Sequence, residues 1–296
     1  MKNKTKHHYI SRMYLNNFSP EGKQGLIHII EMETGKERTF QSIKNTAFKY
    51  NYNTIQLNKE PNDIPEQILA DCESRIGRLF KKITSGNMEL SLDEWSDLLY
   101  YTAQTYLNVP TNRTMSRKVL QDWLRNVLAS KSSDKEFLKM FSETQGLQVL
   151  GKKKYELDEL SELLQKTSNF NVIFSKRLII NYGIKQTRRL YGIFTNMNWA
   201  FFIITDDSCF VTSDRPVTSV SKNPKMPVSI MTSDLLIFPI TKKVLLAGKR
   251  DAKVGNVEIT GETTNALNLI IMANADKYIY SPLKNSELQK QSKKYA

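Results

Sequence analysis

Cysteine and histidine, the residues of most structural zinc sites and disulfide frameworks, are scarce in this chain of 296 residues. It has three histidines and two cysteines, Cys72 and Cys209. One pair of cysteines so far apart, with no CxxC spacing, excludes a zinc ribbon and a disulfide-held miniature domain. We therefore expect two partly buried free thiols and a reducing compartment.

Long hydrophobic runs are lacking as well. The longest, such as Trp199–Thr205, fall far short of the ~20 residues that cross a bilayer. The lysines near the N-terminus are not followed by the apolar segment of a signal peptide. These absences predict a cytoplasmic protein without a membrane partner. The Walker loop and the GxGxxG, GxSxG, HExxH and EF-hand motifs are also absent, which excludes the enzyme classes that they define.

Acidic residues are too few to balance the basic ones, and the formal net charge is +13. Such a charge favours polyanions, of which nucleic acid is the commonest in a cytoplasm, although it also serves solubility and can reflect a lysine-rich composition. One expected helix carries a basic stripe of Arg113, Arg117, Lys118 and Arg125, and Lys152–Lys154, Lys185, Arg188 and Arg189 add further basic residues. These residues form solvent-exposed faces of the protein or, if they converge, a surface that binds the phosphate groups of a nucleic acid.

The N-terminal part predicts a short helix followed by a β-hairpin. Apolar residues recur at helical spacing within Ile10–Phe18. The stretches Leu26–Glu31 and Glu37–Gln41 are strand-like on either side of a turn, and His28 is expected to be structural. The aromatic stretch 48–53 is a further strand or a loop.

The middle of the chain is predicted to be helical. An apolar stripe begins near residue 63, and a second helix starts at Ser91, where Glu94 completes a capping box. Pro110 is expected to end that helix. The later predicted helices are 112–128, 133–141, 158–165 and, with a strand as the alternative, 170–194.

The C-terminal part predicts strands and one helix. Trp199–Thr205 and Cys209–Thr212 are strand-like around a turn at residues 206–208. The remaining predicted elements are strands at 235–240, 244–247 and 278–280, a helix at 262–275 and a frayed polar tail from 285. The expected class is α+β, organised as 1–60, 61–195, 196–284 and 285–296. The two β portions are candidates for one mixed sheet, with the helices as an insertion.

Two polar clusters are candidates for chemistry. Adjacent His7 and His8 would point opposite ways in an extended segment, so they would not grip one metal together, but either could act as a base or a ligand. Arg12 shares a face with His8 if a helix starts there. Asp214 follows a strand, where it could ligate a cation, orient a histidine, accept a proton or merely cap a loop.

These clusters carry a family resemblance. The opening segment, His7-His8-Tyr9-Ile10 through Phe18, resembles the start of a bacterial family catalogued as domain of unknown function 4238. The segments Thr212–Val217, Phe238–Ile240 and Lys277–Ser281 resemble later parts of that family, so the similarity covers nearly the whole chain. Ser11 stands where the family usually has proline, and an arginine expected just before Pro110 is absent.

The resemblance implies that the two motifs meet in one site. On this analogy the candidate catalytic residues are His7, His8, Arg12 and Asp214, with His8 and Asp214 as ligands of a divalent cation such as Mg²⁺ or Mn²⁺. The candidate binding residues are Tyr9, Ser213 and Arg215 of those motifs, Arg113 of the segment around Pro110, and Asn268, which precedes the last motif.

Three functions are compatible with this pattern. The first is a nucleic-acid-processing enzyme, such as a nuclease of a bacterial defence or toxin module, with a histidine as base, Arg12 as phosphate clamp and Asp214 as ligand or orienter. The second is a non-catalytic nucleic-acid-binding or regulatory protein, in which the same residues form a buried polar network. The third is a hydrolase of small phosphorylated or nucleotide ligands.

Overall fold

The computed structural model describes residues 5–57, 60–142, 156–168, 170–220, 230, 233–250 and 255–294. Lys152–Lys154, part of the predicted basic clusters, lie outside these ranges. The chain divides into two compact units, Met1–Thr111 with Tyr182–Ala296 and, between them in sequence, Asn112–Asn181. Across the described ranges, no helix is both long and apolar enough to cross a membrane.

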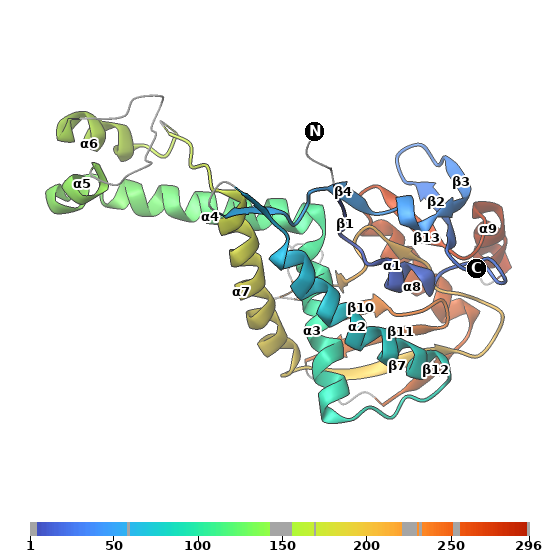
Figure 1. The fold of residues 1–296 in the computed structure, drawn as a ribbon. Coiled ribbons are helices and arrows are strands. Elements are labelled where there is room, and N and C mark those ends of the chain that lie inside the picture. The colour runs from blue at the N-terminus through green and yellow to red at the C-terminus, as the bar shows by residue number, and fades with distance from the viewer. Residues whose placement is uncertain are drawn as a thin grey trace. The chain divides into compact units, whose positions relative to one another are not determined.

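The chain is α+β, as predicted, and Figure 1 shows its elements. The strands are β1 (Lys6–His8), β2 (Leu26–Glu31), β3 (Glu37–Ser42), β4 (Phe48–Tyr50), β5 (Ile55–Leu57), β6 (Glu60–Asn62), β7 (Asn198–Ile204), β8 (Thr212–Ser213), β9 (Thr218–Val220), β10 (Leu235–Pro239), β11 (Val244–Lys249), β12 (Val257–Ile259) and β13 (Tyr278–Ser281). The helices are α1 (Arg12–Asn16), the 3₁₀ turn η1 (Ile43–Asn45), α2 (Ile64–Thr84), α3 (Leu92–Asn108), α4 (Pro110–Ser130), α5 (Lys135–Ser142), α6 (Leu157–Gln165), α7 (Lys176–Phe194), α8 (Gly261–Ala273) and α9 (Asn285–Lys294).

A four-stranded antiparallel sheet joins the N-terminal hairpin to the C-terminal strands in the order β3-β2-β13-β8. The predicted hairpin is therefore confirmed, and so is its association with C-terminal strands. A second sheet, in the order β12-β7-β11-β10-β9, is mixed because β12 runs parallel to β7. The β portions thus form two principal sheets rather than one.

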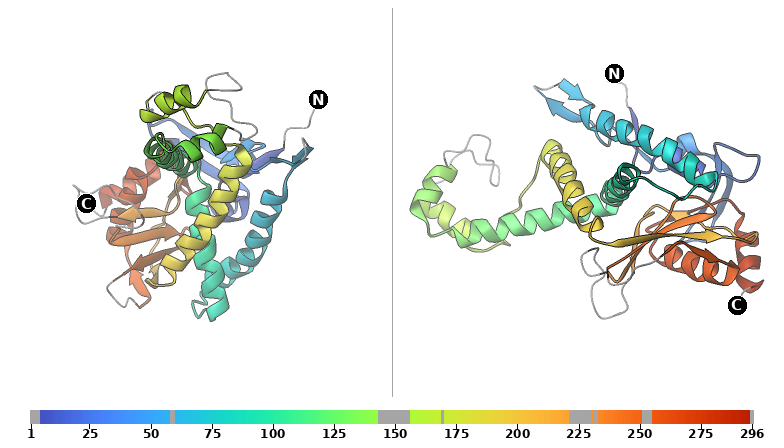
Figure 2. Two further views of the ribbon diagram at one scale, coloured as in Figure 1. Left: turned by 90° about the vertical axis from the view of Figure 1, so that its left-hand side faces the viewer. Right: turned by 90° about the horizontal axis from the view of Figure 1, so that it is seen from below.

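Helices cover both faces of this β structure (Figure 2). On one face lie α2 and α3, with the Trp95 ring of α3 stacked on Phe201 of β7 at 5.3 Å between centroids. Helix α8 lies on the other face. The Ser91 side chain accepts the N–H of Glu94 at the start of α3, and the Glu94 side chain accepts the N–H of Ser91. The predicted capping box is therefore confirmed. The apolar stripe of α2 buries Ile76, among others, in the main core.

Three predicted boundaries or pairings are wrong. The stretches 199–205 and 209–212 are not a hairpin: β7 pairs with β11, whereas Thr212 of β8 pairs with β13 in the other sheet. The helix predicted to start at residue 112 begins at Pro110, because the first turn of a helix tolerates a missing N–H, whereas α3 ends before Pro110 as predicted. The tail expected to fray forms α9, where Lys284 N–H donates to Glu287 (2.9 Å) and Asn285 N–H donates to Glu37 (2.9 Å).

The second unit holds a small apolar core of its own. Leucines of α4, α5 and α6 meet there, among them Leu128, Leu138 and Leu160, together with Phe170. Helix α7 begins at Lys176, six residues later than its predicted start at Phe170. The basic residues of α4 belong to this unit.

Candidate functional site

The N-terminal motif is a short strand that places its two histidines on opposite sides. Strand β1 pairs antiparallel with β4, with His7 opposite Lys49 and His8 opposite Phe48. Adjacent side chains of a strand alternate in direction. The prediction that His7 and His8 point apart follows this geometry: His7 contacts the segment leading into α2, and His8 contacts η1.

His7 ties the N-terminal strand to the start of α2. It is 1% exposed, and its Nδ1 accepts the backbone N–H of Asn53 at 2.9 Å. The other ring nitrogen, Nε2, lies 3.8 Å from Oδ1 of Asp63. Asn53 continues the network by donating to Glu66 at 2.6 Å. These contacts give His7 a role in holding the strand, away from solvent.

His8 is held neutral, and one of its ring nitrogens is buried without a described hydrogen-bond partner. Burial and the nearby Arg12 charge lower its pKa, and these effects outweigh the backbone carbonyls of Lys44 and Ile43, to which the ring donates. Its Nε2 is buried and has no hydrogen-bond partner among the described residues. We infer that Nδ1 is the donor and that Nε2 keeps a free lone pair.

Arg12 opens α1 and faces an acidic residue that the sequence analysis missed. Ser11 caps this helix by accepting the N–H of Tyr14 at 3.1 Å. Burial, reinforced by the charge of Glu66, raises the pKa of Glu73 to about 7, although the Arg12 charge acts to lower it. Glu66 and Glu73 stand two turns apart on α2, and that spacing was the available signal.

We expect Glu73→Gln to stabilise the protein at pH 8 and to change little at pH 4. The pKa of Glu73 is higher in the folded state than its ordinary value of 4.5, so its contribution to stability is present below that value and is lost as the pH rises through about 7. With allowance for partial exposure, the gain at pH 8 is about 1–2 kcal/mol. Thermal unfolding at both pH values measures it, with exposed Glu89→Gln as the control. Equal effects of Glu73→Gln at both pH values would contradict it.

The carboxylate of Asp214 binds the backbone just before β13. Its Oδ1 accepts the N–H of Asp276 and its Oδ2 accepts the N–H of Lys277, both at 2.9 Å, while its own N–H donates to the carbonyl of Tyr278 at 3.0 Å. Burial raises the pKa of Asp214 more than these amides lower it. Both carboxylate oxygens are thus occupied by backbone amides.

No described contact joins the two predicted metal ligands. Hydrogen bonds and ion pairs of the described ranges do not link His8 to Asp214, and these ranges contain no group of three acidic, histidine or cysteine side chains arranged to hold a metal ion. A divalent cation at this pair remains a prediction.

The other predicted binding residues make local hydrogen bonds or ion pairs, or belong to the second unit. Ser213 accepts the N–H of Arg215 at 3.1 Å, and the Arg215 guanidinium lies 3.5 Å from Asp276. Asn268 of α8 accepts the N–H of Val211 at 3.0 Å and donates to the carbonyl of Cys209 at 2.9 Å. Arg113 lies in α4, in the second unit.

The N-terminal and C-terminal motifs do lie together in the first unit. The Tyr14 hydroxyl is 2.7 Å from Oγ1 of Thr212 and donates to the carbonyl of Pro239 at 2.7 Å. Tyr9 reaches the same region, since burial raises its pKa to about 12 and the charge of Asp214 adds to the effect. The meeting of the two motifs therefore runs through Tyr9 and Tyr14 and not through the histidines.

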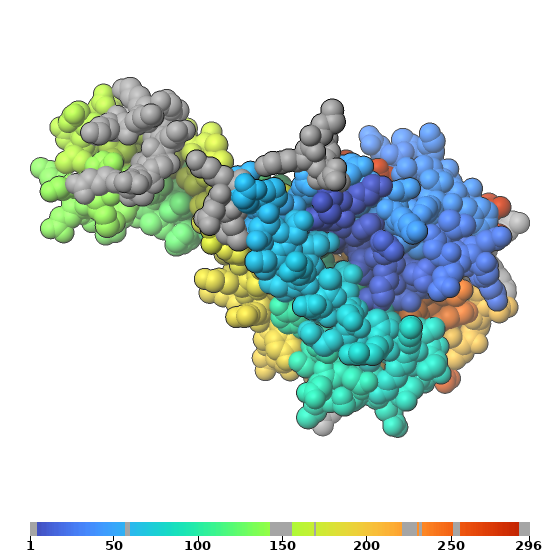
Figure 3. Space-filling view, viewed as in Figure 1, coloured from blue at the N-terminus to red at the C-terminus, as the bar shows by residue number. Residues whose placement is uncertain are grey.

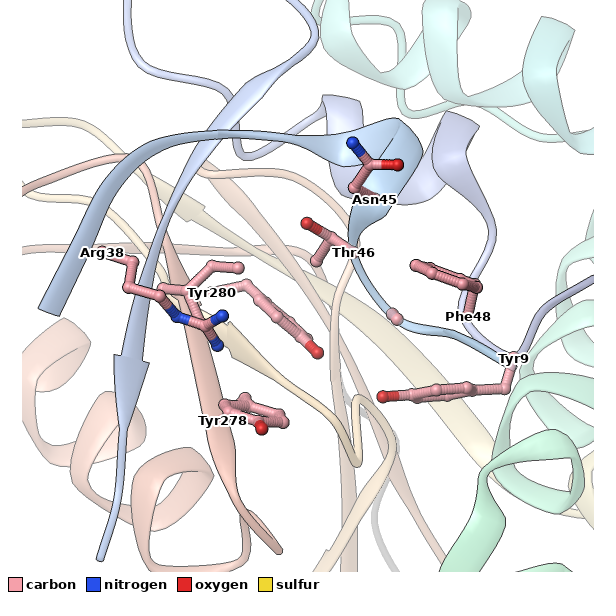
Figure 4. Close-up of a pocket in the computed structure, with 9 residues that line it drawn as sticks. Tyr9, Arg38, Asn45, Thr46, Phe48, Tyr278 and Tyr280 are labelled. Atoms are coloured by element: carbon pink, nitrogen blue, oxygen red, sulfur yellow. The ribbon is translucent and has the colours of Figure 1, made fainter. Parts of the chain in front are cut away.

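A half-open pocket of about 180 Å³ adjoins this junction. Figure 4 shows the guanidinium of Arg38 and the hydroxyls of Tyr9 and Tyr280 directed toward one another within it. The Arg38 guanidinium also lies 5.5 Å from the centroid of the Tyr278 ring. The lining residues are Tyr9, Ile29, Arg38, Asn45, Thr46, Ala47, Phe48, Tyr278 and Tyr280. Rings and hydrogen-bond donors thus share one small space.

The backbone at the pocket is strained. Ala47 has φ +52°, a left-handed conformation that costs a residue with a Cβ about 1 kcal/mol. Its carbonyl accepts the N–H of Tyr9 at 2.9 Å, which fixes the start of α1 against the pocket wall. Strain of this kind gathers at ligand sites. Glycine is the usual residue in a left-handed conformation, and no glycine lies near Ala47. The sequence therefore did not indicate this conformation.

Exposed cations surround the pocket. Lys6 donates to Oδ1 of Asn45 at 2.6 Å and lies 4.5 Å from the centroid of the Phe48 ring. Lys44 and Lys49 are exposed on the neighbouring backbone. Arg38 and these three lysines make no ion pair with any carboxylate that the structure describes. The N-terminal segment, η1 and the β2–β3 hairpin lie side by side on the face drawn in Figure 3. Arg38 lines the pocket, and Lys6 contacts its lining residues Asn45 and Phe48, so this side of the pocket carries positive charge.

The comparison with known proteins identifies a family without an assigned activity. The family described as "Protein of unknown function (DUF4238)" matches residues 6–285, which include both motifs and the pocket. No curated protein and no solved structure matches the chain.

Proposed function

The chain belongs to the DUF4238 family, and from that premise we propose that it binds nucleic acid, in a cytoplasm, at the basic rim of the Tyr9–Tyr280 pocket. The observation that carries the proposal is the set of exposed cations with no described carboxylate partner. Such cations keep their full attraction for phosphate groups, and each contact with a strand releases condensed counterions.

Two features favour binding over cleavage. The oxygens of Asp214 accept backbone amides, and His7 is buried in a network with Asn53 and Glu66. Side chains with these contacts stabilise the local structure of the site. The Arg38 guanidinium and the two tyrosine hydroxyls offer donors and ring faces, which suit recognition of a ligand more than attack on it.

A nuclease, as in a bacterial defence or toxin module, is the second candidate, and His8 is the observation that favours it. A neutral imidazole with a free Nε2 beside Arg12 is suited to accept a proton while the guanidinium holds a phosphate. A divalent cation would supply the Lewis acid that these residues lack.

We expect the purified protein to bind labelled RNA or DNA with an affinity that falls steeply with salt. Fluorescence anisotropy across a salt series measures it, using single-stranded RNA, single-stranded DNA and duplex DNA. Replacing Lys44 and Lys49 with glutamine should reduce the slope of log affinity against log salt by about 1–2. The control changes the same net charge elsewhere, at Lys23 and Lys81. Equal slopes for the two double variants, or no binding at low salt, would refute the proposal.

The same samples separate binding from cleavage. Gel analysis of the strands with Mg²⁺ or Mn²⁺, with chelator and with His8→Ala tests the second candidate. Cleavage that is lost in chelator and in the variant would establish a metal-dependent nuclease. Intact strands under all conditions, with binding retained, would leave a binding protein.

A further inference from the structure

We propose that the pocket holds a single unpaired nucleotide, with its base against the aromatic rings and its phosphate at Arg38. This inference rests on the proposed nucleic-acid binding and names the part of the strand that the site selects. It assigns a role to Arg38 and Phe48, which lie outside the family motifs, and to Tyr278 and Tyr280, which lie in the last of those motifs but were not among the predicted site residues.

The partly exposed rings of Tyr278 and Phe48 provide a stacking surface, whereas Tyr280 is 1% exposed and supports it from below. Tyr278 and Tyr280 lie with their ring planes 29° apart and centroids 6.5 Å apart, and the Phe48 ring belongs to the opposite wall. Unstacked bases bind on such aromatic faces and on guanidinium planes, whereas bases within a duplex cannot reach them. An aromatic pocket with an arginine at its edge therefore favours an unpaired base.

The polar groups suit a nucleotide better than a bare ring. Arg38 is exposed at the rim and presents a planar fork of N–H donors that matches a phosphate. Deeper in, the Tyr280 hydroxyl donates to that of Tyr9, which keeps its own proton as a donor for the edge of a base. Burial holds the pKa of Tyr9 at about 12, so its hydroxyl keeps its proton at neutral pH.

The size of the pocket limits the ligand to one unit. Its 180 Å³ equals the liquid volume of about six water molecules and lies below the ~300–1,000 Å³ of pockets for drug-sized ligands. One base fills such a space, and the sugar and the phosphate then lie at the open side. There they meet Arg38 and the surrounding lysines.

The nearby carboxylates do not oppose this arrangement. Asp214 is covered by two backbone amides, and Asp276 lies 3.5 Å from the Arg215 guanidinium. Their charges act on Tyr9, but neither carboxylate lines the pocket. The rim cations therefore dominate at its opening.

The test compares a single strand with the same strand carrying abasic sites, for the wild type, Tyr278→Leu and Tyr278→Phe. We expect Tyr278→Leu to weaken binding of the normal strand about 5- to 100-fold and to leave the abasic strand and the salt slope unchanged. Tyr278→Phe keeps the ring and should bind like the wild type. Arg38→Gln should weaken both strands and lower the salt slope by about one.

The outcomes separate this inference from the proposed function. Salt-dependent binding that is equal for normal and abasic strands, and indifferent to Tyr278→Leu, overturns the nucleotide pocket and leaves nucleic-acid binding intact. Binding of a free mononucleotide that needs the Tyr278 ring, without binding of any strand, supports the pocket and overturns the wider proposal. Competition by inorganic phosphate as strong as that by the mononucleotide reduces the site to an anion site and overturns the inference.

Discussion

Gly248→Ala is expected to lower the free energy of unfolding by about 3 kcal/mol. A Cβ on Gly248 of β11 would lie 2.6–2.7 Å from three ring atoms of Trp199, its partner in β7. The ring cannot swing aside easily, because its Nε1 donates to the carbonyl of Phe194 at 2.7 Å and it packs edge-to-face with the Phe194 ring. Overpacking of a fixed core side chain costs 1–3 kcal/mol or more.

Chemical and thermal unfolding of the variant measure this effect. Gly192→Ala is the matched control, since a Cβ there meets nothing within 4 Å. Gly192 lies within α7, where alanine should raise stability by about 0.5–1 kcal/mol. The same chemical change is thus expected to have opposite signs at the two positions. A Gly248→Ala variant as stable as the wild type would show that Trp199 has room to move.

Asp214→Ala should destabilise the fold by about 2–4 kcal/mol. The carboxylate accepts the backbone N–H groups of Asp276 and Lys277, and hydrogen bonds to a charged group contribute ~1.5–3 kcal/mol each, part of which the burial of the charge offsets. Its loss leaves two amide groups without their acceptor at the start of β13. The variant should therefore melt earlier whether or not the protein has a catalytic activity.

The melting temperature decides between an architectural and a purely catalytic Asp214. Asp207→Ala is the control, because that carboxylate is exposed on a neighbouring loop. Asp214→Asn keeps one acceptor oxygen and should fall between the wild type and Asp214→Ala. Unchanged melting of Asp214→Ala, together with lost activity, would instead support the catalytic role predicted from the motif.

Local patterns predicted the elements well where the relevant residues are close in sequence. The capping box joins Ser91 and Glu94, which are three positions apart, and the β2–β3 hairpin surrounds one turn. The opposite directions of His7 and His8 follow from the geometry of a strand alone. In these cases both interacting residues lie within the same short sequence pattern.

Features whose partners are remote were missed or misread. Asp206 makes the predicted local turn contact, with its Oδ1 accepting the N–H of Ser208 at 2.9 Å, but the contact of its Oδ2 with the N–H of Gly261 at the start of α8 (2.7 Å) was missed. The amides that occupy Asp214 come from residues more than sixty positions later. The pocket needs β3, η1 and β13 to assemble, and Arg38 alone resembles any exposed lysine or arginine of an edge strand.

The pairing of β2 with β13 has a consequence for synthesis of the chain. Ile30 lies opposite Ile279, so β2 of the N-terminal hairpin can pair with β13 only after nearly the whole chain has been synthesised. Until then buried residues such as Ile27 and Ile29 belong to an open strand edge, which invites wrong pairing. Such long-range closure also slows folding. A ribosome that stalls before residue 278 therefore carries a chain whose four-stranded sheet cannot yet form.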